Sequence, residues 1–176
     1  MTSAFDATTR MRNVDGMHLL RRLATFALLA LSVACAHAAD LYKAGDALVP
    51  FTVKDQNEQE FTFTPGPRIV IVSFSMGVGK DANGYFAKQP ADFLAKNKTL
   101  FIANIYGMPS IGRFFALPKM KKYPHRILLG DDEHLLDRFP TQEGKLTVLR
   151  LDPSAKITAV EFVDAEKELP AIFTAK

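Results

Sequence analysis

Thiols are nearly absent from this sequence, which has a single cysteine, Cys35, among 176 residues. Cys35 lies in an apolar run near the N-terminus. Disulfide exchange needs a thiolate nucleophile and usually a second thiol that resolves the mixed disulfide. One cysteine cannot form an internal disulfide, so the domain must be stabilised by packing.

Tryptophan is also absent, and neither sign of charge dominates. Four of the 22 basic and two of the 19 acidic residues precede residue 39, which leaves 18 basic and 17 acidic residues after it. A nucleic-acid-binding domain normally carries a basic surplus. We therefore expect no nucleic-acid partner.

The N-terminal segment 1–38 has the features of an export signal. Residues 1–16 are polar, and Met17 is a second candidate for the start of translation. Arg21 and Arg22 precede the apolar run 23–36 and an Ala-His-Ala site, which predicts a signal peptide over 17–38 that is cleaved after Ala38. This run is shorter than the roughly 20 residues of a membrane span.

The signal predicts a periplasmic protein with one domain over residues 39–176 and no transmembrane anchor after cleavage. The alternative is a lipoprotein anchored through Cys35. Lipoprotein signals usually place leucine three residues before the cysteine, whereas Leu31 stands four before it. The cleaved signal is the preferred interpretation.

Apolar periodicity after residue 39 predicts an α/β fold with a mixed central sheet. Strands are expected at 60–64, 68–74, 99–106, 126–129, 145–151 and 156–163, the last two as an antiparallel hairpin. A helix is expected at 81–96, and Pro90 should kink it or split it in two. A second helix should begin at Pro109 and be interrupted at Pro118. Two further helices are expected at 134–139 and 165–173.

Three local strings resemble segments of the thioredoxin-like superfamily, especially its peroxiredoxin and TlpA-type branch. They are the Gly-Asp…Pro-Phe entry at 45–55, the Leu-Leu-Gly-Asp-Asp segment at 128–132 and the hairpin at 148–157. Taken in their order and spacing, the three strings make the resemblance cover residues 44–173. The arrangement also resembles that of small periplasmic YtfJ-type proteins. It implies a three-layer fold in which helices flank a mixed central sheet.

The family's thiol motif has no counterpart in this chain. If Pro90 matches the family's helix proline, the two cysteine positions fall on Ala82 and Tyr85; counted from Phe74, they fall on Gly79 and Ala82. Leu146 stands where the family has a cis-proline, and a non-proline residue prefers the trans form by about 2.5–4 kcal/mol. We expect no thiol redox activity, no catalytic residue and no cofactor.

Residues 75–81 lie between a predicted strand and a predicted helix. They lack the first glycine and the Ser/Thr of a phosphate-binding P-loop, and their plainest interpretation is a flexible loop in which Asp81 caps the helix. The resemblance implies that this loop lines the functional face and contacts a protein or peptide partner. The candidate binding residues are Gly79, Lys80, Asp81, Ala82, Tyr85 and Leu146. The alternative is a non-thiol enzyme with Asp81 as base and Tyr85 as acid.

The one basic cluster consists of Lys119, Lys121, Lys122, His125 and Arg126, with Arg113 upstream. It suits an anion, an acidic partner or a membrane surface, or it is a solvated helix end. His125 and His134, with Asp131, Asp132 and Asp137, do not form a recognised metal motif, so we predict no metal site.

Aromatic residues are numerous, and most are expected in the core. Ile111, Phe114 and Phe115 are placed on the inner side of their helix. Because two adjacent residues cannot both point inward, one phenylalanine should be partly exposed, either on an interaction surface or beside an apolar groove for a peptide or lipid-like ligand. The preferred hypothesis is an exported, redox-inactive binding or assembly module of the bacterial envelope.

Overall fold

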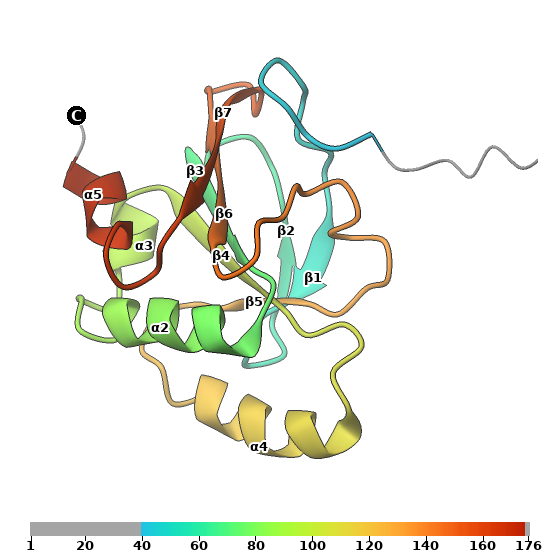
Figure 1. The fold of residues 1–176 in the computed structure, drawn as a ribbon, viewed down its shortest axis with the longest axis vertical. Helices are drawn as coiled ribbons and strands as arrows, with labels where there is room; N and C mark the ends of the chain where they lie inside the picture. The colour runs from blue at the N-terminus through green and yellow to red at the C-terminus, as the bar shows by residue number, and fades with distance from the viewer. Residues whose placement is uncertain (1–39, 175–176) are drawn as a thin grey trace, which may run out of the picture. The chain divides into compact units, whose positions relative to one another are not determined.

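The computed structural model describes residues 40–174, so the predicted signal peptide and Cys35 lie outside the described residues. A central sheet has the strand order β5-β4-β3-β6-β7 (Figure 1). Strands β3 (Ile69–Ser73), β4 (Thr99–Asn104) and β5 (Leu128–Gly130) are parallel, and β6 (Leu146–Leu151) and β7 (Ile157–Val163) complete the sheet as an antiparallel hairpin.

A second, two-stranded sheet pairs β1 (Thr52–Lys54) with β2 (Glu60–Thr62). The helices are α2 (Met76–Phe86), α3 (Phe93–Lys96), α4 (Ser110–Met120) and α5 (Leu169–Thr174). The mixed sheet with flanking helices confirms the predicted α/β fold. No described helix has the length and apolarity to cross a bilayer.

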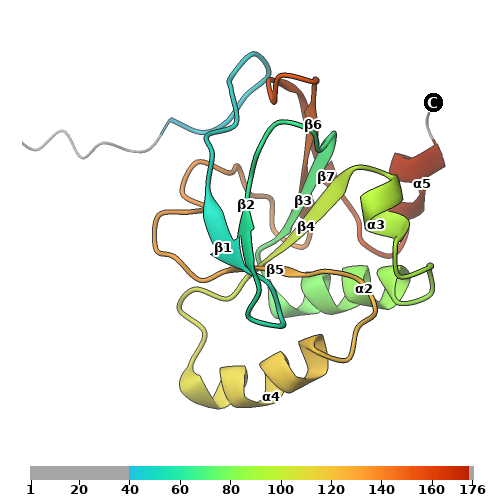
Figure 2. The ribbon, with the colours of Figure 1, turned by 180° about the vertical axis from the view of Figure 1, so that it is seen from behind.

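Side chains of the sheet alternate between two apolar layers, as the two-residue period of a strand requires. Val70 and Val72 of β3 pack on one face, and Ile71 packs on the other. Helices α2, α3 and α5 cover the face of Ile71. The opposite face is covered by Tyr42 and Leu48 from the start of the described chain, by the β1–β2 hairpin and by the loop before β6. Figure 2 shows this hairpin from behind.

Helix α2 begins five residues earlier than expected, so the predicted flexible loop at 75–81 is wrong. Ser75 caps the helix: its hydroxyl accepts a hydrogen bond from the N–H of Val78 at 3.4 Å. Gly79 lies inside the helix where α2 approaches β3, and a Cβ there would stand 3.1 Å from the Ser73 hydroxyl. Asp81 lies in mid-helix and caps nothing.

Proline acts differently at each helical position. The chain divides at Pro90 into α2 and α3, one of the two expected outcomes. The expected interruption at Pro118 does not occur, because the helix loses only one N–H there and Lys121 still donates to the carbonyl of Leu117. The last helix begins at Leu169, rather than at residue 165, with Pro170 in its first turn, where proline is tolerated.

The helix expected over residues 134–139 is wrong, because this segment forms successive turns. The Asp132 carboxylate accepts the N–H of His134, and the carbonyl of Leu136 accepts that of Phe139 three residues later. These short-range hydrogen bonds satisfy the backbone without an α-helical turn.

The turn between β1 and β2 is held by the buried carboxylate of Asp55. This carboxylate accepts the N–H groups of Asn57 at 2.8 Å and Gln59 at 3.0 Å, and Nε of Arg126 at 2.9 Å. Burial acts to raise the pKa of Asp55. The hydrogen bonds from Gln59, Asn57 and Arg126 outweigh burial and hold that pKa below its ordinary value.

Gln56 connects the same turn to the strand that leads into β5. Its side-chain N–H donates to the carbonyl of His125 at 2.7 Å, and its side-chain oxygen accepts the N–H of Ile127 at 2.8 Å. The imidazole of His125 is buried among aromatic rings of the core. Burial lowers the pKa of His125 to about 4.

The His125 side chain donates to α2 in one defined tautomer. Asn83 donates its side-chain N–H to the carbonyl of Gly79, so its oxygen faces Nε2 of His125 at 2.8 Å and must accept from it. Nδ1 of His125 is therefore unprotonated, and it is buried with no hydrogen-bond partner among the described residues.

We expect Asp55→Asn to lower the free energy of unfolding by about 1–3 kcal/mol at neutral pH, because the Arg126 ion pair is lost. The lowered pKa of Asp55 means that its stabilisation is complete above the unfolded value of about 3.9 and is lost as the pH falls through the folded value. Urea unfolding at several pH values measures both effects. Asp92→Asn, at an exposed carboxylate paired with Lys96, should change stability by less than about 0.5 kcal/mol.

His125 should make stability fall as the pH drops from about 6.5 toward 4, because the unfolded chain takes up a proton that the folded chain excludes. The slope should approach about 1.4 kcal/mol per pH unit. His125→Gln retains an N–H donor for Asn83 and should remove this slope. His134→Gln should leave the slope below about pH 6.5 unchanged, because the raised pKa of His134 affects stability only above its unfolded value. An equal slope in both variants below that pH would contradict the assignment.

Candidate functional site

A groove of about 370 Å³ lies between α2 and α4. Met76, Met108 and Met120 line it together with Phe115 and Tyr123, and small residues of both helices leave the space open. The two helices run beside each other in both views of the fold (Figures 1 and 2). The groove thus adjoins the N-terminal half of α2, the helix that follows the central strand.

The inner wall of the groove is polar where β3 and α2 meet. Ser73 is 2% exposed, lines the groove and makes no side-chain hydrogen bond among the described residues. Asn83 is buried beside it and is fully engaged by His125 and Gly79. The wall therefore has a rigid amide and one hydroxyl that can still donate.

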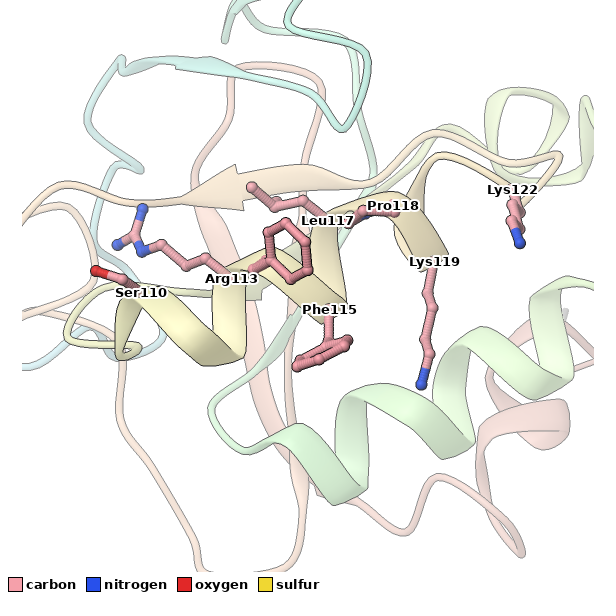
Figure 3. A pocket seen from close by; sticks show the side chains of 8 residues that line it. Ser110, Arg113, Phe115, Leu117, Pro118, Lys119 and Lys122 are labelled. Atoms are coloured by element: carbon pink, nitrogen blue, oxygen red, sulfur yellow. The ribbon is translucent and has the colours of Figure 1, made fainter.

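Two lysines flank the groove, Lys80 from α2 and Lys119 from α4. Neither forms an ion pair within the described part of the chain, and no acidic residue lines the groove. Figure 3 shows Phe115 and Lys119 extending from α4 toward α2. The groove thus combines an apolar wall with a positively charged rim.

The outer side of α4 is an exposed apolar surface. No residue of α4 is buried, and Ile111, Phe114 and Phe115 are 67%, 71% and 58% exposed. The rings of Phe114 and Phe115 meet edge to face at 5.3 Å, beside a shallow hollow of about 680 Å³ (Figure 3). The expectation of an inward face is wrong for Ile111 and Phe114, because α4 lies beside α2 rather than on the sheet; Phe115 points toward α2 and lines the groove.

Helix α4 is held at its N-terminal end by Arg113. The guanidinium donates to the carbonyls of Ile105 and Met108 and pairs with both carboxylate oxygens of Asp131. These hydrogen bonds fix the first turn to the ends of β4 and β5. The apolar side chains of α4 are therefore presented on an anchored helix.

The structure separates the predicted binding residues. Gly79 and Lys80 line the groove. Ala82 and Leu146 are buried in the core, and Tyr85 packs against Phe93 and Phe173 on the other side of α2. Leu146 therefore cannot reach a partner at the surface.

The two residues of the enzyme hypothesis do not form an acid–base pair. Burial raises the pKa of Tyr85 above its ordinary value. Neither the Asp81 carboxylate nor the Tyr85 hydroxyl makes a hydrogen bond or ion pair within residues 40–174. Nothing in this arrangement orients the two groups toward a common substrate atom.

The predicted basic cluster is also divided. Arg126 pairs with Asp55, and Lys121 pairs with Glu58 on the β1–β2 hairpin. His125 is buried and neutral, so it adds no charge to the surface. Lys119 and Lys122 remain as cations beside the hollow on α4.

The acidic segment after β5 does not assemble a metal site. His134 pairs with Asp137 at 2.9 Å, and this carboxylate raises the pKa of the imidazole. Across residues 40–174, no group of three or more His, Cys, Asp or Glu side chains could hold a metal ion.

Sequence reasoning missed Ser73, Asn83 and the three groove methionines. A signal was available, because Met76, Met108 and Met120 are the only methionines after Met17, and they flank the two helices. The three methionines come together only because α4 lies beside α2, and no local sequence pattern predicts that placement.

No family model and no curated protein matches this chain. Similarity is found at the level of structure. A peroxiredoxin-like protein from Aquifex aeolicus is 12% identical with a TM-score of 0.53, and the alignment covers 78% of this chain and 87% of that one.

A peroxidoxin from Mycobacterium tuberculosis is 14% identical with a TM-score of 0.51, covering 75% of this chain and 94% of the other. The thioredoxin domain of a thiol-disulfide oxidoreductase from Bacteroides vulgatus is 15% identical with a TM-score of 0.52, covering 77% and 99%. At these identities the likeness establishes the fold alone. Residues 40–174 have the thioredoxin-like fold, with no cysteine among them.

Proposed function

We propose that this protein is a redox-inactive, exported binding module of the bacterial envelope, which holds a protein or peptide partner on α4. The observation that carries the proposal is the exposure of Ile111, Phe114 and Phe115 on one anchored helix. Contiguous exposed apolar surface on a soluble domain commonly marks an interaction site. Export is supported by the signal-like segment 17–38 in the sequence.

The chemistry of α2 argues against a thiol enzyme. The resemblance places the family's cysteines at the start of the helix after the central strand, where the helix dipole favours a thiolate. In this chain the two possible registers place those cysteines on Ala82 and Tyr85 or on Gly79 and Ala82, none of which carries a thiol. The nearby Ser75 hydroxyl is used as a cap. A serine hydroxyl cannot form a mixed disulfide, so the fold is retained without its nucleophile.

The α4 surface has the composition of a protein-binding patch. Phenylalanine and isoleucine supply a large apolar area, and Lys119 and Lys122 lie at its margin. Aromatic anchors with a polar margin are typical of protein interfaces. A partner with an apolar centre and acidic edges would complement this surface.

The full-length protein should neither reduce insulin disulfides nor consume hydrogen peroxide faster than buffer does. Cys35→Ser tests whether the one thiol contributes, and the expected result is no difference from the unsubstituted chain. Turnover that disappears in Cys35→Ser would contradict the redox-inactive assignment, because it would identify Cys35 as a nucleophile.

Affinity capture from an envelope extract should recover a partner that depends on α4. Replacing both Ile111 and Phe114 with serine should reduce the recovered partner by about tenfold or more, since truncated anchors commonly dominate binding. A matched control replaces Leu41 and Val49, which are 50% and 51% exposed, with serine and should retain the partner. Equal loss in both variants, with folding verified by circular dichroism, would contradict a specific surface on α4.

A further inference from the structure

The methionines converge on the groove between α2 and α4. Met76, Met108 and Met120 reach it from α2, from the loop before α4 and from the end of α4. Methionine is unbranched and polarisable, so it adapts to flexible apolar ligands. A wall of three such side chains, with Phe115 and Tyr123, suits a hydrocarbon chain.

The charged side chains of the groove are both cations. Lys80 and Lys119 make no ion pair within the described residues, and the hydroxyl of Ser73, at the groove wall, makes no hydrogen bond there. The lining of 15 residues includes no aspartate or glutamate. Charge complementarity therefore favours a ligand that brings an anionic, acceptor-rich group.

The volume restricts the size of the ligand. Small-molecule sites span roughly 300–1,000 Å³, so 370 Å³ is near the lower limit. That space suits one slender chain better than a two-chain lipid or a helix of a partner protein.

We propose that this groove binds an anionic single-chain amphiphile, a hydrocarbon chain ending in a carboxylate. The chain lies against Met76, Met108 and Met120, and the carboxylate is neutralised by Lys80 and Lys119. This site adjoins the proposed protein-binding surface and shares Phe115 and Lys119 with it, whereas Ile111 and Phe114 do not line the groove.

The three methionines also provide the test. In the full-length protein labelled with [methyl-¹³C]methionine, decanoate below its micelle concentration should shift the methyl signals of Met76, Met108 and Met120. Single Met→Leu variants assign the three signals, and the methyl signals of the remaining methionines serve as internal references. Decyltrimethylammonium, which has the same chain and the opposite charge, should bind more weakly.

Replacing both Lys80 and Lys119 with glutamine should weaken decanoate binding by about tenfold, as expected for two partly exposed charge contacts. Lys88→Gln combined with Lys156→Gln changes the net charge equally at exposed sites outside the groove and should leave the affinity unchanged. Added salt should weaken decanoate binding to the unsubstituted chain.

Three results would overturn the proposal. The methyl signals could remain unshifted by decanoate, the cationic amphiphile could bind as tightly as decanoate, or the lysine variant could bind as well as its control. A captured partner that shifts these methyl signals when decanoate does not would assign the groove to a protein segment instead. The Ile111→Ser/Phe114→Ser variant should keep the decanoate shifts, so failure of the partner proposal and failure of this one are distinguishable.

Discussion

A buried chain of amide and imidazole hydrogen bonds links three segments that are distant in sequence. Gln56 holds the backbone of His125, the ring of His125 donates to Asn83, and Asn83 donates to the carbonyl of Gly79. Unpaired polar groups are costly in an apolar core, so the segments are held in the relative positions that satisfy these groups. The network ends at Asn83 and thereby fixes the inner wall of the groove.

Helix α4 is anchored through one end and packs little of its own surface. Arg113 fastens its first turn, whereas the side chains of Ile111, Phe114 and Phe115 are largely exposed. Burial of a large apolar side chain contributes about 1.5–3 kcal/mol, so leaving three of them exposed forgoes a substantial stabilisation. A partner that covers this surface would recover part of that free energy, which is the reason for proposing an interaction surface here.

The fold does not depend on the thiols that its structural neighbours are named for. Alternating apolar residues in β3, β4 and β6 form two packed layers, and no cysteine takes part in either. The start of α2 is stabilised by the Ser75 cap. The helix that carries a reactive centre in thiol enzymes can therefore persist as a structural element and a groove wall.

Local pattern was sufficient to predict the strands of the central sheet, including the hairpin at 146–163, because a continuous apolar run or a two-residue alternation indicates which faces are buried. It also showed that residues 39–176 contain no thiol nucleophile. It did not predict the short strand β1. The start of α2 follows from a local contact, the Ser75 cap, which the sequence analysis did not anticipate. The exposed face of α4 and the pairing of Arg126 and Lys121 with the β1–β2 hairpin were decided by tertiary structure. Both depend on contacts between segments far apart in the chain, such as Asp55 with Arg126. An amphipathic pattern shows that a helix has an apolar face, but it does not show which neighbouring segment will cover that face.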